Sequence, residues 1–186
     1  NAYMKKGLII EREIGASSGG RPPILLELNK EDAFTIGIHV DEFFIKGIVI
    51  NLAVGQVKID ERKIESTDLK DSIRQVINSL KEGIDKEKIK GIALSIEHPG
   101  VDPQKIAVTI EDELNMTVYT GIPSMAAAYA ESLHGTNIYE NTFLYSYKDL
   151  GECVFFENFG FYTSEEESVA NCAYLRPWRG DMSIEN

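Results

Sequence analysis

A Gly-Gly-Arg tripeptide near the start of the chain is the clearest group of residues with the chemistry to hold a ligand. Gly19, Gly20 and Arg21 lie within residues 17–23, whose two prolines lead into an apolar segment. Glycines allow a backbone to lie against a ligand, and an arginine side chain can enter the minor groove of DNA. Three interpretations are open at this point: a flexible linker, a loop that binds phosphate, or a tip that contacts DNA.

Charge is distributed unevenly along the 186 residues. The net charge of −11 argues against a protein that coats nucleic acid. Residues 1–22 nevertheless carry +2, because two lysines and two arginines stand against two glutamates, and the other 164 residues carry −13. Lys5 and Lys6 belong to this basic front and would contact phosphates, which position a protein without reading bases. The alternatives are solvated lysines at a helix end and chance variation over a short segment.

Composition is that of an ordinary soluble protein, with 43% hydrophobic and 26% charged residues. No apolar run approaches the ~20 residues of a membrane helix, and no signal peptide opens the chain. Cys153 and Cys172 are the two cysteines, too few for a disulfide framework or a four-cysteine zinc site. We therefore expect a cytoplasmic protein with no membrane partner, no metal and no cofactor.

The Gly-Gly-Arg tip lies between two predicted strands, residues 8–14 and 23–28, which would form a hairpin with a long loop. Residues 1–7 are typical of the last turn of a helix that stops at Gly7. Chains rarely begin within a helix, so we expect further sequence ahead of Asn1. The predicted unit, residues 1–30, is the end of a longer DNA-contacting element.

The rest of the pattern alternates from strands to helices. Apolar residues recur at helical spacing over 68–82, and Pro123 opens a second helix that runs to Gly135. Strands are predicted at 33–40, 43–50, 55–64, 89–96, 117–120, 142–147 and 152–158. No element is predicted between residues 101 and 116. An antiparallel meander followed by crossover helices indicates an α/β fold of the ribonuclease-H/actin-like kind.

Three stretches of the sequence carry a resemblance to a known family. "MKKGLIIEREIGASSGGRPPILLELN", followed by "FTIGIHV" and "KGIVINLAVGQV", resembles the ROK family of repressors and sugar kinases, in particular its branch of sugar-responsive regulators such as the xylose and N-acetylglucosamine repressors. The resemblance implies a sugar-kinase-like lobe over residues 31–162, preceded by the wing of a winged helix-turn-helix whose tip is the Gly-Gly-Arg stretch. Residues 163–186 would be an irregular tail or the start of a second lobe.

The residues that handle phosphate in the family's kinases are replaced here. Those enzymes carry an Asp-x-Gly-Gly-Thr-Lys turn, and residues 39–44 read His-Val-Asp-Glu-Phe-Phe instead. A phosphate ~4 Å from the Asp41 or Glu42 carboxylate would be repelled by about 4 kcal/mol at an effective dielectric constant near 20. Ile122 and Pro123 stand where the resemblance places the Asn-Asp pair that supplies the catalytic base. The family's zinc motif is also missing. We expect no catalytic residue and no enzyme.

Two residues after the strand at 89–96 are candidates for binding an effector. His98 lies at the strand's carboxyl end, where open α/β sheets bind ligands, and Gly100 matches the family's Pro-Gly turn. A plain loop histidine and a structural turn are the alternatives.

These expectations together describe a DNA-binding regulator of sugar metabolism, most simply a repressor. It would bind operator DNA as a homodimer and respond to a small sugar effector. The alternatives are an ATP-dependent sugar kinase that uses unconventional residues, and a decayed interaction domain that does not bind DNA.

Overall fold

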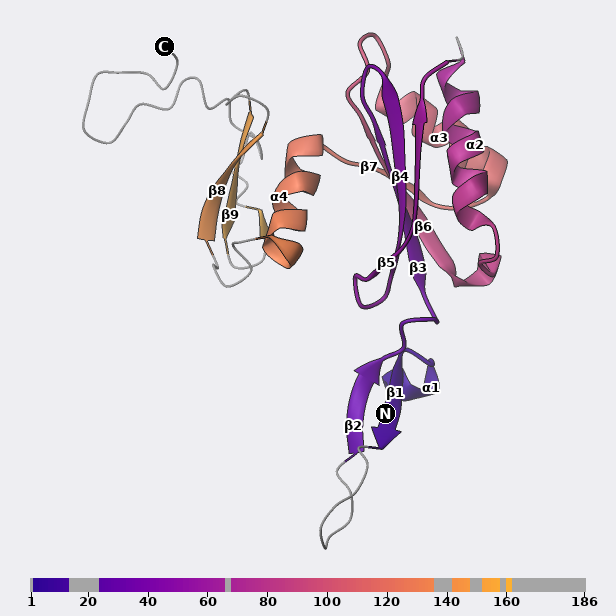
Figure 1. The fold of residues 1–186 in the computed structure, drawn as a ribbon, viewed down its shortest axis with the longest axis vertical. Coiled ribbons are helices and arrows are strands. Elements are labelled where there is room, and N and C mark those ends of the chain that lie inside the picture. The colour runs from indigo at the N-terminus through magenta and orange to yellow at the C-terminus, as the bar shows by residue number, and fades with distance from the viewer. Residues whose placement is uncertain are drawn as a thin grey trace, which may run out of the picture. The chain divides into compact units, whose positions relative to one another are not determined.

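The computed structural model describes residues 2–13, 24–65, 68–135, 142–147, 152–157 and 160–161 (Figure 1). Backbone contacts divide the chain into two compact units, Asn1–Thr120 and Gly121–Asn186. The predicted tail, residues 163–186, lies outside the described residues. None of the described helices combines the length and apolar character that crossing a membrane requires.

The first unit begins with the predicted helix end and hairpin. Helix α1 (Ala2–Lys5) is followed by strands β1 (Ile9–Glu13) and β2 (Ile24–Leu28), which pair antiparallel. Gly7 ends the helix in the left-handed region, at φ 74°, and its N–H donates to the Met4 carbonyl oxygen at 3.0 Å. Glycine reaches this conformation without strain, so the predicted stop at Gly7 is confirmed.

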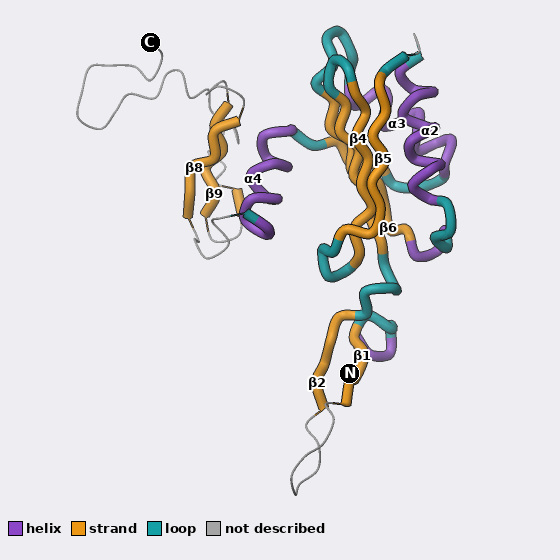
Figure 2. Tube along the Cα trace, in the orientation of Figure 1, coloured by secondary structure: helices purple, strands orange, loops and turns teal. Residues whose placement is uncertain are grey.

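A five-stranded mixed sheet forms the body of the first unit, in the order β5-β4-β3-β6-β7 (Figure 2). Strands β3, β4 and β5 are the predicted antiparallel meander, and β6 and β7 run parallel to β3. Their bounds are β3 (Phe34–Val40), β4 (Phe44–Asn51), β5 (Gln56–Lys63), β6 (Ile89–Ile96) and β7 (Val118–Thr120). The parallel pairing brings the carboxyl ends of β3 and β6 side by side.

Helices α2 (Leu69–Lys81) and α3 (Pro103–Leu114) both cover the same face of this sheet, and a short 3-10 helix, η1 (Lys86–Lys88), leads into β6 (Figure 1). The Asp68 carboxylate caps α2 by accepting hydrogen bonds from the N–H groups of Lys70 and Asp71, at 3.0 and 3.3 Å. The core beneath the helices consists of aliphatic side chains, among them Ile36, Ile45, Ile73, Ile77, Ile92 and Leu94.

Helix α3 corrects the expectation of no element between residues 101 and 116. The sequence carried its start signals, because the Asp102 carboxylate accepts hydrogen bonds from two first-turn N–H groups and Pro103 opens the helix. Asn115 ends it in the left-handed region at φ 48°. Helical spacing is present too, in the buried residues Ile106, Ala107 and Ile110. The apolar face is short, and it was therefore missed.

Helix α2 lies close to β4 because Gly47 has no side chain. A Cβ atom at this position would lie 2.6 Å from Leu80 Cδ1 and 2.7 Å from Val76 Cγ1. Real Cβ atoms do not approach other carbons so closely, so a side chain here would force Leu80 and Val76, or the helix that carries them, to shift. Gly47 therefore sets the packing distance between these two elements.

The second unit contains helix α4 (Pro123–His134) and a three-stranded antiparallel sheet in the order β10-β9-β8. Its strands are β8 (Thr142–Tyr147), β9 (Glu152–Glu157) and β10 (Gly160–Phe161). Small side chains form the buried side of α4, namely Ser124, Ala128 and Ser132, and they allow the helix to pack closely on β8 and β9. The predicted helix and strand pair are confirmed.

The turn between β4 and β5 holds a valine in an unfavourable backbone conformation. Val54 has φ 60°, in the left-handed region that β-branched residues avoid at a cost of about 1–2 kcal/mol. Val54→Gly is expected to raise the free energy of unfolding by about 0.5–1 kcal/mol, because glycine removes the strain but adds its own entropy cost. Urea denaturation measures the change. Ala53→Gly, in the same turn without positive φ, should destabilise the protein; equal effects of the two variants would contradict the strain.

Candidate nucleic-acid interface and ligand-facing edge

The segment that carries the Gly-Gly-Arg tip joins the two strands of the hairpin, β1 and β2. Ile9 lies opposite Leu28 at one end of the ladder, and Glu13 lies opposite Ile24 at the other. Residues 14–23 connect Glu13 to Ile24 in the chain. Gly19, Gly20 and Arg21 themselves lie outside the described residues. Sequence and register therefore agree on a hairpin with a ten-residue connection, which is longer than most hairpin loops.

Lys5 and Lys6 lie at the carboxyl end of α1, and both side chains are exposed. Within the described part of the chain, the structure gives neither ammonium group an ion pair. The same hairpin also carries Arg12, which lies 3.5 Å from the Glu27 carboxylate on the neighbouring strand. Two of the predicted basic side chains are thus free to contact an anion, while the strand arginine is already paired.

One face of the hairpin carries a row of exposed apolar side chains on β2, which lies opposite Ile9, Glu11 and Glu13 of β1. Ile24, Leu26 and Leu28 alternate along β2 and lie on the same face as Ile9, which follows from the register of the two strands. The three β2 side chains are 45–55% exposed. A soluble protein rarely leaves such a row in water, so this face has the character of a packing or binding surface.

The turn that follows β3 is held by the side chain of Asp41, its first residue. Asp41 Oδ1 accepts hydrogen bonds from the N–H groups of Phe43 and Phe44, at 2.8 and 2.7 Å. Desolvation by burial acts to raise the pKa of Asp41, but these two hydrogen bonds, with the charges of His39 and Lys46, outweigh it and lower the pKa below its ordinary value. Asp41 therefore stays ionised and occupies two amides that could otherwise face an anion.

The hydrogen bonds of Asp41 give a second reason, besides its charge, why this turn is unsuited to bind phosphate. A phosphate-binding turn needs free backbone N–H groups directed at the ligand. In this turn the N–H groups of Phe43 and Phe44 are taken by the Asp41 side chain, and the Phe43 ring is 59% exposed above them. The turn thus lacks both the charge and the free donors of a nucleotide site.

Strands β3 and β6 share a polar pair at this edge that sequence reasoning missed. His39 Nδ1 lies 3.4 Å from Ser95 Oγ, on adjacent parallel strands. The sequence places His39 at a strand end, but it gives no sign that residue 95 lies beside it. The register of two parallel strands joined by a long crossover supplies that information, and only the structure shows it.

The two predicted effector residues follow β6 in a short loop. His98 is half-buried, and its Nδ1 lies 3.2 Å from the carbonyl oxygen of Pro99. Gly100 is exposed with φ 73°, and a Cβ atom there would have open space around it. The glycine is thus favoured by its backbone conformation and not by a close neighbour. Both residues follow the carboxyl end of β6, and their role in binding an effector stays a prediction.

At the start of α4, no described group can act as a general base. Pro123 is the first helical residue, and Ile122 precedes it with no side-chain hydrogen bond to cap the helix. Ser124 Oγ, in the first turn, is fully buried and has no hydrogen-bond partner. A hydroxyl in this setting lacks the acceptor that would activate it. Among the described residues, no cluster of three His, Cys, Asp or Glu side chains could hold a metal ion.

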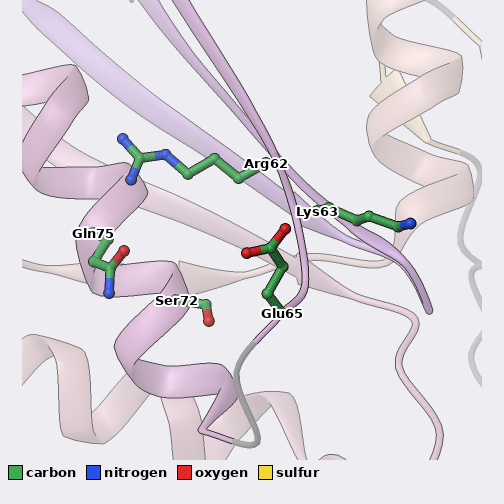
Figure 3. A pocket seen from close by; sticks show the side chains of 5 residues that line it. All are labelled: Arg62, Lys63, Glu65, Ser72 and Gln75. Carbon is green, nitrogen blue, oxygen red and sulfur yellow. The ribbon is translucent and has the colours of Figure 1, made fainter.

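A depression of about 500 Å³ lies between the end of β5 and α2, and sequence reasoning did not anticipate it (Figure 3). Its lining is polar: Arg62, Lys63, Glu65, Ser72 and Gln75. Arg62 is held by Asp60, with Nε–Oδ1 at 3.1 Å and Nη2–Oδ2 at 2.8 Å. Lys63 projects to the other side of the strand (Figure 3). The side chains of Arg62 and Lys63 point in different directions, so they do not form a shared binding site for an anionic ligand.

Comparison with known proteins relates the chain to xylose repressors. It is 29% identical over 165 residues to the xylose repressor of Bacillus spizizenii, an alignment that covers 78% of this chain and 43% of that protein. No family model matches the chain. It therefore spans less than half the length of this curated relative.

Solved structures show the same fold. A ROK family transcriptional regulator, a homologue of the E. coli MLC protein, matches 93% of this chain and 49% of its own, with a TM-score of 0.67 and 15% identity. A ROK family glucokinase from Streptomyces griseus, solved with glucose and AMPPNP, matches 77% of this chain and 51% of its own, with a TM-score of 0.63 and 14% identity. The chain therefore shares its fold with these two proteins over the matched residues.

Proposed function

We propose, from the relation of this chain in sequence and fold to the ROK repressors and sugar kinases, that it belongs to a transcriptional repressor of sugar metabolism. The chain would join the wing of a winged helix-turn-helix, residues 1–30, to a sugar-kinase-like body, residues 31–162. The wing tip, Gly19-Gly20-Arg21, would enter the minor groove of operator DNA, and Lys5 and Lys6 would contact phosphates. The body would not catalyse phosphotransfer and would need no metal or cofactor.

The hairpin placed directly before the sheet is the observation that carries this proposal. Its exposed apolar row, Ile24, Leu26 and Leu28, lies beside Glu11 and Glu13 on the same face and has the character of a surface that packs on helices. This row of side chains supports a unit that packs on further helices ahead of a kinase-like sheet.

The closed turn at Asp41 supports a body that binds without catalysis. Its two amide donors are occupied, and the positions of the family's Asn-Asp pair hold Ile122 and Pro123. A small sugar could still bind at the edge formed by β3 and β6, where His98 and Gly100 lie. We propose that this binding changes the affinity of a cytoplasmic homodimer for its operator.

Replacing Lys5 and Lys6 with alanine is expected to weaken binding to all DNA sequences alike. Each phosphate contact contributes to affinity through counterion release, so the slope of log Kd against log salt concentration should fall by about 1 for each lysine removed. Fluorescence anisotropy of the full-length protein over a salt series measures the slope. Lys81→Ala, at the end of a body helix, is the matched control and should leave it unchanged; an unaltered slope in the Lys5/Lys6 variant would contradict the assignment.

A phosphorylation assay separates this function from a sugar kinase. The full-length protein is incubated with ATP, magnesium and, one at a time, D-xylose, D-glucose and N-acetylglucosamine, and ADP release is followed. We expect no turnover above the rate without sugar. Turnover with any sugar, abolished by Asp41→Ala or another single carboxylate substitution, would overturn the proposal in favour of the kinase.

A further inference from the structure

The hairpin is joined to the sheet by a five-residue connector, residues 29–33, that is held by hydrogen bonds. Asn29 Nδ2 donates to the Gly7 carbonyl oxygen at 2.9 Å, and its backbone N–H donates to the Leu8 carbonyl oxygen at 2.9 Å. Its Oδ1 accepts from the Glu31 N–H at 3.3 Å. Asn29 thus links the end of α1 and the connector through its side chain, and the base of the hairpin through its backbone N–H.

Lys88 fixes the same connector from the side of the sheet. Its Nζ donates to the Glu31 carbonyl oxygen at 2.8 Å. Lys88 directly precedes β6, whose first residue, Ile89, pairs with Phe34 at the start of β3. The connector is therefore hydrogen-bonded on one side to Gly7 and Leu8, which precede β1, and on the other to Lys88, which precedes β6.

Apolar packing does little to hold the hairpin in place. The large side chains of β2, Ile24, Leu25, Leu26 and Leu28, are all at least 45% exposed. The connector enters the core only at its last residue, Ala33, which is buried. An element with so little buried apolar surface moves easily unless hydrogen bonds restrain it. The direction of the hairpin must then depend on the connector's few polar contacts.

We propose that Asn29 and Lys88 are positioning residues, whose hydrogen bonds to the Gly7 and Glu31 carbonyl oxygens set the angle at which the hairpin leaves the sheet. The inference rests on the proposed repressor function, because that angle fixes how far the wing tip of each protomer reaches along DNA. A homodimer with a fixed angle accepts one separation of its two half-sites. A loosened junction accepts several.

The experiment uses the full-length protein and four variants. Lys88→Met and Asn29→Ala remove the contacts, Lys88→Arg keeps a donor at the connector, and Lys90→Met is the matched control. Lys90 lies two residues further along and donates to the Glu87 carbonyl oxygen at 2.7 Å, within its own turn. It carries the same charge as Lys88 but does not touch the connector.

The first measurement is hydrogen–deuterium exchange of the amides of residues 29–32, which needs no DNA. Loss of one hydrogen bond, about 0.5–1.5 kcal/mol, should speed exchange about two- to tenfold in Lys88→Met and Asn29→Ala. Lys88→Arg and Lys90→Met should exchange like the unmodified protein. Unchanged exchange in both disrupting variants, or the same increase in Lys90→Met, would overturn the proposal.

The second measurement is the ratio of affinities for an operator of native half-site spacing and one lengthened by two base pairs. Lys88→Met should lower this ratio about two- to tenfold, whereas Lys90→Met should keep the ratio. A merely structural lysine would not change the ratio, and its constancy in Lys88→Met would refute the positioning role. If the unmodified protein binds no DNA sequence specifically, the repressor function fails, and the exchange result alone decides whether the junction is held as proposed.

Discussion

Replacing Arg21 with alanine is expected to weaken operator binding by about 1–3 kcal/mol, roughly five- to 150-fold, without changing the free energy of unfolding. An arginine at a glycine-flanked hairpin tip can enter the minor groove, where the negative potential is strongest in narrow A·T-rich segments. Gly19 and Gly20 leave room for the backbone to approach. Anisotropy titrations of labelled operator with the full-length protein measure the loss, and chemical denaturation measures stability.

Arg12→Ala is the matched control for this substitution. Arg12 lies on β1 of the same hairpin, is 70% exposed, and is 3.5 Å from the Glu27 carboxylate. Its removal deletes the same charge from the same unit, so it reports the general electrostatic contribution alone. We expect Arg12→Ala to weaken specific and non-specific DNA equally, and Arg21→Ala to weaken the operator more. Equal losses in the two variants would rule out a specific role for the tip.

Ile77→Ala is expected to lower the free energy of unfolding by about 2–5 kcal/mol. Ile77 lies on the inner face of α2 and is fully buried among the aliphatic side chains between helix and sheet. Truncation removes buried apolar surface and leaves a cavity that a sheet and two helices cannot easily close. The change is read from urea denaturation at constant m-value, which also reports whether the unfolded state has changed.

Asn78→Ala provides the comparison for the core prediction. Asn78 is the next residue of α2 and its side chain is exposed. Surface substitutions of this kind usually change stability by less than about 0.5 kcal/mol. A loss in Ile77→Ala no larger than that in Asn78→Ala would mean that the packing of α2 on the sheet is not as described.

Much of the fold follows from local pattern in the sequence. Alternating apolar residues identify the meander, and the row Ile73, Val76, Ile77 and Leu80 identifies α2. Pro123 and Gly7 mark the start and end of helices at the residues where the structure has them. Helix α3 was not predicted because its apolar face is short, and apolar spacing alone does not identify it. The cap residues Asp102 and Asn115 mark its two ends. For this helix, the residues at its two ends are a better sequence signal than the spacing of its apolar residues.

The candidate site was less accessible to sequence reasoning. The replacement of glycines by Asp41 and Glu42 is visible in the sequence, but the capture of two backbone amides by the Asp41 carboxylate is a matter of loop geometry. The pair of His39 and Ser95 depends on the register of β3 and β6, which are separated by a meander and a helix. Contacts between strands far apart in the chain have no local signature, so such pairs emerge only in the folded molecule.

Selection of DNA by the full-length protein tests the repressor function most directly. The protein is used to enrich bound sequences from a random library, and the affinity for the enriched sequence is compared with that for random DNA at physiological salt. We expect a two-fold related sequence bound at least about 10³ times more tightly than random DNA. Enrichment of no sequence, with affinities for all DNA within a factor of a few, would contradict the proposal that this chain is part of a DNA-reading repressor.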